Sequence, residues 1–177
     1  PYASNYQLKS GEVFTTPEFV FTLSYNGTEP AKRNLHDWAR RYQLKDGMGD
    51  YVAKQVIRCM YLRVVVVKDA RVQLRGITLK EKCPGIRNTK VVDIYHTLSQ
   101  YSSDITVYDP WANPESVQRA YGIQIQNHLP QQQFDAVILC VAHSQFLQLD
   151  VRSLVRGNGV VYDVKGVLDR HVIDARL

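Results

Sequence analysis

The fold of this chain depends on the stretch Gly76-Ile-Thr-Leu-Lys-Glu-Lys-Cys-Pro-Gly-Ile-Arg-Asn-Thr-Lys90. A Val-rich run precedes it and an amphipathic run follows it, so the pattern predicts a strand, a loop and a helix that Asn88 or Thr89 would cap. Backbone N–H groups at the start of that helix would hold a phosphate together with the cations of the loop, which are Lys80, Lys82 and Arg87. A surface loop with solvated lysines explains the same residues equally well.

The runs on either side of this stretch alternate between strand and helix patterns. The predicted strands are Leu62–Val67, Arg71–Thr78 and Ile105–Tyr108, and the predicted helices are Asn88–Gln100 and Glu115–Tyr121, the latter ended by Gly122. Phe134–Ala142 is a nearly continuous apolar run, typical of a parallel strand that is buried on both faces. A helix over Ser144–Val155, a turn at Gly157-Asn-Gly159 and a last strand over Val160–Asp163 complete the pattern.

This alternation predicts an α/β fold, a three-layer Rossmann-like parallel sheet with helices on both faces. In such a sheet the ligand binds beyond the carboxyl ends of the strands. That edge would collect the Lys80–Arg87 loop, Asp109, His143 and the segment Asp163-Val-Lys165. His143 would bond a ribose or a phosphate there or cap the helix that follows it, and we favour the cap.

The first 60 residues have a different pattern. Pro1–Pro30 is rich in Thr, Phe, Val and Tyr and predicts a hairpin, and a helical spacing of apolar residues runs from Leu35 to Met60. The Asp46-Gly-Met-Gly49 step should weaken or divide that helix. Its two glycines do not form a dinucleotide-binding fingerprint, because no strand precedes them and the third glycine is missing.

Composition limits the classes of function. The chain has 177 residues, 45% of them hydrophobic and 22% charged, as in soluble globular proteins. A net charge of +5 favours anionic ligands, but the basic residues are scattered, so we expect no nucleic-acid site. No apolar run approaches the roughly 20 residues of a membrane span, and the N-terminus lacks the pattern of a signal peptide, so we expect a cytoplasmic protein without a membrane partner.

The three cysteines are widely spaced, which fits neither a disulfide framework nor a metal site. Cys59 and Cys140 lie in apolar runs and are interpreted as core thiols.

Five segments, in order, resemble the UDP-glucose/GDP-mannose dehydrogenase family, and most of all its branch that oxidises UDP-N-acetylhexosamines for bacterial surface polysaccharides. They are Asp46-Gly-Met-Gly-Asp-Tyr-Val-Ala53, Gly76-Ile-Thr-Leu-Lys-Glu-Lys-Cys-Pro-Gly-Ile-Arg-Asn-Thr-Lys-Val-Val-Asp93, Tyr108-Asp-Pro-Trp-Ala112, Val141-Ala-His143 and Tyr162-Asp-Val-Lys-Gly-Val-Leu168. The resemblance covers the chain from about Arg40 to its end.

The resemblance implies a domain organisation. Residues 1–38 would be an extension of unclear fold, residues 39–62 part of a central dimerisation helix, and residues 63–177 the C-terminal domain that binds the nucleotide sugar. The family's NAD-binding domain and its Gly-Gly-x-Cys segment with the catalytic thiol have no counterpart here. The chain is therefore expected to be inactive alone and to contain no catalytic residue, with NAD bound mainly by the absent domain and a homodimer formed by the full protein.

The resemblance also implies site residues for an NAD-dependent UDP-sugar 6-dehydrogenase, which oxidises the sugar C6 alcohol to a carboxylate. Lys80 and Lys165 would bind the UDP-sugar substrate, and Arg87 would reach the cofactor side; a solvated turn lysine is the alternative for Lys165. Cys83 lies beside two lysines that would lower a thiol pKa. The family's nucleophile belongs to another motif, so we assign Cys83 a role in the loop. No metal ligand is implied.

Two departures from the family pattern favour an alternative. Gln73 and Arg75 stand on one face of a strand that should be buried, where the family has apolar residues. Gly85 stands where the family usually has an acidic residue. The alternative is a non-catalytic Rossmann-like module for assembly or regulation.

Overall fold

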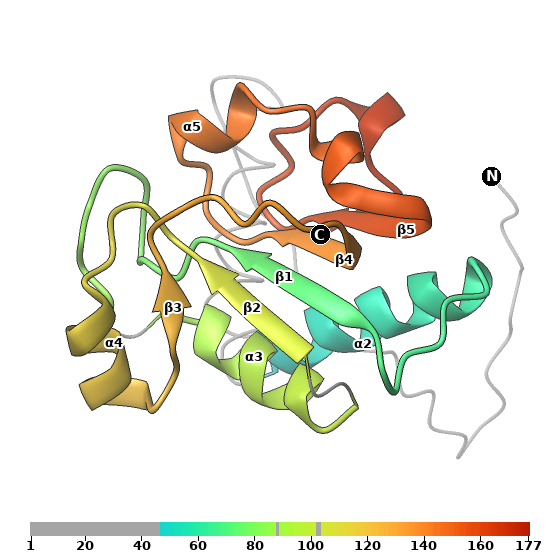
Figure 1. Ribbon diagram of the computed structural model, residues 1–177. Coiled ribbons are helices and arrows are strands. Elements are labelled where there is room, and N and C mark those ends of the chain that lie inside the picture. Colours follow the sequence, from blue (N-terminus) through green and yellow to red (C-terminus); the bar gives the residue numbers. More distant parts are fainter. Residues whose placement is uncertain (1–46, 88, 102–103) are drawn as a thin grey trace, which may run out of the picture. The chain divides into compact units, whose positions relative to one another are not determined.

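A parallel six-stranded sheet forms the centre of the computed structural model, which describes residues 47–87, 89–101 and 104–177 (Figure 1). The strand order is β3-β2-β1-β4-β5-β6, and every pairing is parallel. The strands are β1 (Arg71–Arg75), β2 (Asp104–Tyr108), β3 (Ile125–Gln126), β4 (Phe134–Leu139), β5 (Val155–Asp163) and β6 (Ala175–Arg176). The predicted hairpin and the first part of the predicted helix lie outside the described residues.

Helices lie on both faces of this sheet. Figure 1 shows α2 (Met48–Leu62) and α3 (Val91–Ser99) on one face, and α5 (Ser144–Leu147) and the 3₁₀ turn η2 (Val151–Leu154) on the other. The remaining elements are α4 (Pro114–Tyr121), which contacts β3, and the 3₁₀ turn η3 (Arg170–Val172). The three-layer α/β prediction is confirmed. Within the described part of the chain, no helix has both the length and the apolar character needed to cross a membrane.

The larger hydrophobic core lies between the sheet and the pair α2 and α3. Val52, Val56 and Met60 of α2 are fully buried there. A Cβ at Gly49 would stand 2.3 Å from the Cβ of Asp93, so only glycine allows α2 and α3 to approach so closely. The division of the chain at residue 62 remains a prediction, but α2 packs with the sheet as part of one compact unit, residues 46–177.

The predicted strand Leu62–Val67 is wrong. Helix α2 continues to Leu62, and the N–H groups of Arg63 and Val65 donate to the carbonyl of Met60, so this backbone closes the end of the helix instead of pairing with a strand. Val64 is highly exposed and has φ 58°, which a β-branched residue rarely adopts. The segment carries the chain from α2 to β1.

The predictions for residues 144–159 are also wrong in part. Helix α5 stops at Leu147, and Asp150 begins a separate 3₁₀ turn by accepting the N–H of Arg152. Strand β5 starts at Val155, so the Gly157-Asn-Gly159 segment lies inside the strand, where the register against β4 shifts. A Cβ at Gly159 would stand 2.7 Å from the Cβ of Val155, so glycine permits this irregularity.

The elements nearest to the opening stretch match the predictions closely. Strand β1 leads into the loop, and Thr89 Oγ1 accepts the N–H of Val91 at the start of α3 (3.4 Å). Asn88 lies outside the described residues. Helix α4 ends at Gly122, whose φ of 69° and N–H bond to Gln118 O are those of a left-handed C-cap.

Strand β1 carries two buried polar side chains on the face opposite α2 and α3. Gln73 and Arg75 are both 0% exposed, which confirms the prediction that they share a buried face. The Arg75 guanidinium lies 4.8 Å from the ring centroid of Phe146 and 5.3 Å from that of Tyr108. Among the described residues, neither polar group has a hydrogen-bond partner. Burial lowers the pKa of Arg75 to about 10, against a smaller opposing effect of Tyr108.

Candidate functional site

The carboxyl ends of β1 and β4 mark the point where the chain changes direction in the sheet. The chain passes from β1 to β2 on one side and from β4 to β5 on the other. Loops therefore diverge at this point and leave a crevice, which is the usual position of a ligand in open α/β sheets. Gly76 opens the first loop with φ 92°, and a Cβ there would stand 2.5 Å from the Cβ of Val141. Glycine is thus required where the loops after β1 and β4 meet.

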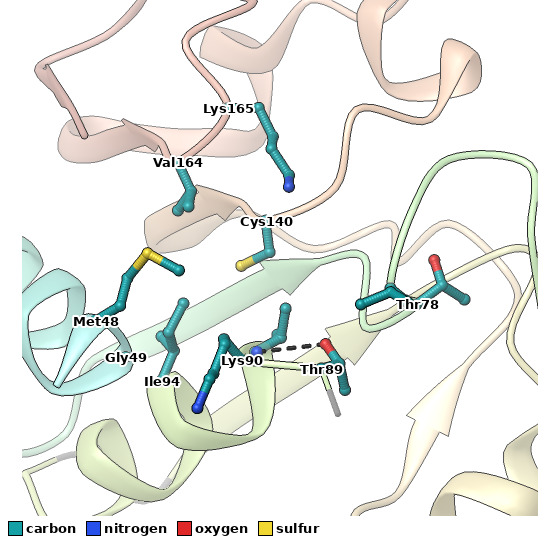
Figure 2. Close-up of a pocket in the computed structure, with 11 residues that line it drawn as sticks. Met48, Gly49, Thr78, Thr89, Lys90, Ile94, Cys140, Val164 and Lys165 are labelled. Atoms are coloured by element: carbon teal, nitrogen blue, oxygen red, sulfur yellow. Dashed lines mark hydrogen bonds between the residues drawn. The ribbon is translucent and has the colours of Figure 1, made fainter. Parts of the chain in front are cut away.

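A pocket of about 180 Å³ lies at this crevice (Figure 2). It is bounded by the first residues of α2 and α3 and by the segments that follow β1, β4 and β5; the residues are Met48, Gly49, Thr78, Leu79, Thr89, Lys90, Val91, Ile94, Cys140, Val164 and Lys165. Figure 2 shows the side chain of Lys165 pointing from the end of β5 toward Cys140. The pocket is smaller than the roughly 300–1,000 Å³ of complete small-molecule sites, so it would enclose part of a ligand.

Two helices begin at this pocket. Gly47 precedes α2, and no side chain caps the N–H groups of the first turn of that helix. Lys90 precedes α3, and its ammonium lies 3.5 Å from the carboxylate of Asp93. Uncapped N–H groups and the positive end of a helix dipole attract negative charge. The pocket is therefore suited to an anionic ligand.

A second hollow lies beside the first and shares Lys165 with it. It is lined by Lys80, Glu81, Val141, Ala142, Lys165 and Val167. The structure thus brings two of the predicted site residues, Lys80 and Lys165, to one hollow, although 85 positions separate them in the sequence. Both are exposed, and neither forms an ion pair with another of the described residues. Two unpaired ammonium groups at one edge are available to phosphate oxygens.

Asp109 bonds to the backbone of two loops at this edge of the sheet. It is fully buried directly after β2, and its carboxylate accepts four backbone N–H groups, those of Ile77 (2.7 Å), Thr78 (3.0 Å), Trp111 (2.8 Å) and Ala112 (3.1 Å). Burial alone would raise the pKa of Asp109. Hydrogen bonds from His143 and from these N–H groups outweigh that effect and hold the pKa well below its ordinary value.

His143 joins the same group of buried polar atoms. Its Nε2 lies 3.0 Å from Thr78 Oγ1 and 3.4 Å from Asp109 Oδ2, and its Nδ1 accepts the N–H of Lys82 (3.3 Å). His143 occupies the N-cap position of α5, as expected, but its side chain makes no capping bond to that helix. The ring is fully buried and its nitrogens already have partners, so it does not face a ribose or a phosphate either.

Arg87 lies apart from the two lysines. It lines a separate groove between the loop and α4, bounded by Leu79, Pro84, Gly85, Ile86, Asn113, Ser116, Ala120 and Tyr121. The Tyr121 hydroxyl donates to Ile86 O (2.7 Å) and ties the loop to that helix. The structure does not bring Arg87 into the hollow of Lys80 and Lys165.

The thiols differ in their surroundings. Cys140 is buried, and burial raises its pKa to about 12, so it is an unreactive thiol although it lines the pocket. Burial also raises the pKa of the half-buried Cys59. Cys83 is half-buried in the loop, and its assigned role there remains a prediction.

Sequence reasoning missed several residues of the pocket. Met48, Gly49, Thr78 and Lys90 were not among the predicted site residues. A signal was present for the first two, since the glycine before an amphipathic helix belongs to a segment that resembles the family. The bonds that join Asp109 to His143 had no signal beyond the position of each residue after a strand.

Comparison with known proteins identifies the family to which this chain belongs. Residues 73–170 match the model of the UDP-glucose/GDP-mannose dehydrogenase family, UDP binding domain. The chain is 42% identical over 138 residues to UDP-N-acetyl-D-glucosamine 6-dehydrogenase of Pseudomonas aeruginosa and 38% identical over 138 residues to that of Salmonella typhi. Each alignment covers 76% of this chain and about a third of the relative, 33% and 32% respectively.

Solved structures show the same fold. NDP-N-acetyl-D-galactosaminuronic acid dehydrogenase of Methanosarcina mazei matches with a TM-score of 0.62 and 15% identity, over 86% of this chain and 30% of that one. UDP-N-acetyl-mannosamine dehydrogenase of S. aureus matches with a TM-score of 0.58 and 17% identity, over 87% and 36%. With its family match over residues 73–170, the chain belongs to the UDP-glucose/GDP-mannose dehydrogenase family and contains that family's UDP-binding domain.

Proposed function

We propose that the described unit binds the UDP part of a UDP-N-acetylhexosamine, and that the complete protein oxidises the C6 alcohol of that sugar to a carboxylate. The observation that carries the proposal is the hollow shared by Lys80 and Lys165, two unpaired lysines beside two helix starts, in a chain that matches a UDP-binding domain. The relatives at 42% and 38% identity are UDP-N-acetyl-D-glucosamine 6-dehydrogenases, which supports the class of sugar.

The two hollows suggest how the nucleotide is divided between them. Lys80 and Lys165 face the pyrophosphate, whose charge would otherwise stay solvated. Met48, Ile94 and Val164 give the pocket an apolar lining that suits the flat face of a pyrimidine ring. In this arrangement Lys165, which lines both hollows, lies at the junction between base and phosphates.

The described residues do not form a dinucleotide-binding site of their own. In a dinucleotide-binding unit the acidic residue after the second strand accepts the ribose hydroxyls. Here the residue in that place, Asp109, is fully buried, and both carboxylate oxygens are already bonded to backbone N–H groups. NAD, the hydride acceptor, therefore binds to another part of the complete protein in this proposal. Arg87, in its separate groove, faces the cofactor side.

The rest of the reaction belongs to the complete protein as well. The chain spans about a third of the length of the curated relatives that it matches. In this proposal the nucleophilic thiol lies outside residues 1–177, the chain contributes no catalytic residue, and it is inactive alone. The complete protein is a cytoplasmic homodimer that supplies a uronate for surface polysaccharide.

Calorimetric titration of UDP into the 177-residue chain tests the binding proposal. We expect weak binding that falls as salt rises, and Lys80→Ala and Lys165→Ala should each weaken it by roughly tenfold, as expected for the loss of a charge-assisted contact. Lys68→Ala is the matched control, since this exposed lysine precedes β1 at the opposite end of the strands. Absence of UDP binding at low salt, or equal effects of all three substitutions, would contradict the proposal.

A second candidate function is a non-catalytic assembly or regulatory module. The unpartnered Gln73 and Arg75 in the buried face of β1 favour it, because they depart from the pattern expected of this domain. Thermal unfolding with UDP separates the two candidates. A ligand that binds only the folded chain must raise the midpoint of unfolding, and an unchanged midpoint at saturating UDP would favour the module.

A further inference from the structure

Lys82 adopts an unusual backbone conformation in the loop that carries Lys80. Its φ is 54°, in the left-handed region that residues with a Cβ rarely occupy. A backbone bond from Leu79 N–H to Gly85 O (2.8 Å) closes the loop. Left-handed residues persist where surrounding contacts hold them. The backbone N–H of Lys82 donates a hydrogen bond to Nδ1 of His143 (3.3 Å).

That bond determines the state of the histidine ring. A backbone N–H can only donate, so Nδ1 of His143 must be the unprotonated nitrogen. The proton of the neutral ring is then on Nε2, where Thr78 Oγ1 and Asp109 Oδ2 lie at 3.0 and 3.4 Å. A doubly protonated ring would lose the bond to Lys82. Neutral His143 therefore connects the loop to Asp109 through both of its nitrogens.

The surroundings of the ring limit its orientation. Phe146 meets it edge to face with centroids 5.1 Å apart, and Trp111 stacks on it at 6.4 Å. Asp109 is itself anchored by four backbone N–H groups. The acceptor that His143 presents to the loop thus has a direction set by the rigid ends of the strands.

We propose that His143 is a positioning residue for nucleotide binding, which holds the Lys80–Arg87 loop through Lys82 so that Lys80 faces Lys165 across the shared hollow. The inference rests on the proposed function, since it concerns how that site is kept in its binding conformation. His143 is buried and touches no ligand in this role; it acts through the loop backbone.

Two substitutions separate this role from ordinary packing. In His143→Asn the side-chain oxygen takes the place of Nδ1 and still accepts from Lys82, whereas in His143→Gln the terminal group takes the place of Nε2 and leaves Lys82 without an acceptor. Both lose the contacts of the ring with Phe146 and Trp111, so we expect both to lower the unfolding midpoint by a similar amount. The two variants should differ in UDP affinity. We expect the affinity of His143→Asn to lie within about threefold of wild type and that of His143→Gln to be roughly tenfold weaker.

The outcomes distinguish the two proposals. Equal UDP affinities for the Asn and Gln variants overturn the positioning role and leave the proposed function intact. No UDP binding by the wild-type chain overturns the proposed function. In that case hydrogen exchange of the Lys82 amide monitors the conformation of the loop. The positioning role requires that this amide stays protected in His143→Asn and loses protection in His143→Gln. If neither variant folds, the ¹⁵N NMR spectrum of the His143 ring in the wild-type chain shows which ring nitrogen carries the proton. A protonated Nδ1 overturns the inference.

Discussion

Two groups of buried polar side chains lie close to the ends of β1 and β2, and they differ in how their atoms are bonded. Asp109 and His143 are fully buried, and each has several hydrogen-bond partners. Gln73 and Arg75 are equally buried, but among the described residues their side-chain nitrogen and oxygen atoms have no hydrogen-bond partner. The guanidinium of Arg75 lies over the faces of two aromatic rings, those of Tyr108 and Phe146.

The position of each residue along its strand explains the difference. Asp109 stands just beyond β2, where the N–H groups of two loops are no longer used by the sheet and point toward its carboxylate. Gln73 is the middle residue of β1 and Arg75 its last, and both are still paired with the two neighbouring strands, which occupy the backbone groups there. A buried polar side chain is therefore easily accommodated one residue past a strand end and poorly accommodated within the strand.

Removing the charge of the well-bonded group should have the largest effect. Asp109→Asn replaces an acceptor oxygen by an NH₂ group that faces backbone N–H donors, so we expect a loss of about 3 kcal/mol in the free energy of unfolding, measured by urea denaturation. Asp104→Asn, an exposed carboxylate paired with Arg71 at 3.4 Å, is the control and should change stability by less than about 0.5 kcal/mol.

The pH dependence checks the same comparison. Because the folded pKa of Asp109 is depressed, its contribution to stability is complete above the unfolded pKa of about 3.9 and is lost as the pH falls below that value toward the folded pKa. Asp109→Asn should therefore flatten the fall in stability below about pH 4. A loss of stability equal to that of Asp104→Asn, with an unchanged acid profile, would show that the four N–H bonds do not stabilise the edge.

Changing the poorly bonded group should have the opposite sign. Arg75→Met keeps an unbranched stem against Tyr108 and Phe146 but removes a buried cation, so we expect a gain of about 1–3 kcal/mol in the free energy of unfolding. Arg71→Met is the matched control on the same strand. Its side chain is 44% exposed, and the substitution should be nearly neutral. A destabilised Arg75→Met would mean that the aromatic faces compensate for the desolvation of the charge.

The sequence predicted the part of the fold that local patterns determine. The β-prone run Arg71–Thr78 predicted β1, the nearly continuous apolar run Phe134–Ala142 predicted β4, and Gly122 predicted the end of α4. Leu62–Val67 has equally strong β propensity, but helix α2 continues to Leu62 and the N–H groups of Arg63 and Val65 bond to the end of that helix, which overrides the propensity. The irregular start of β5 depends on a close approach at Gly159, which no local pattern contains.

The sequence predicted those features of the site that follow from the topology of the sheet. Parallel strands bring their carboxyl ends to one edge, so Asp109, His143 and Lys165 were expected there together. The side-chain role of His143 was not, because a residue that follows a strand and begins a helix is as consistent with a cap as with the buried bonds that it makes. Such partners are set by loop conformation, as in the left-handed Lys82.

Replacement of Gln73 should give the smallest change of the series and tests whether the strand interior or the charge of Arg75 causes the poor accommodation. Gln73→Leu removes two buried polar atoms without partners and keeps a side chain of similar volume, so we expect a gain of about 1 kcal/mol in urea denaturation. Gln126→Leu, on the exposed edge strand β3, is the control and should be neutral. If Gln73→Leu is neutral while Arg75→Met is stabilising, the charge is the cause. If both stabilise, position within the strand is the cause, and the double variant should depart from the sum of the two because the side chains are neighbours on one face.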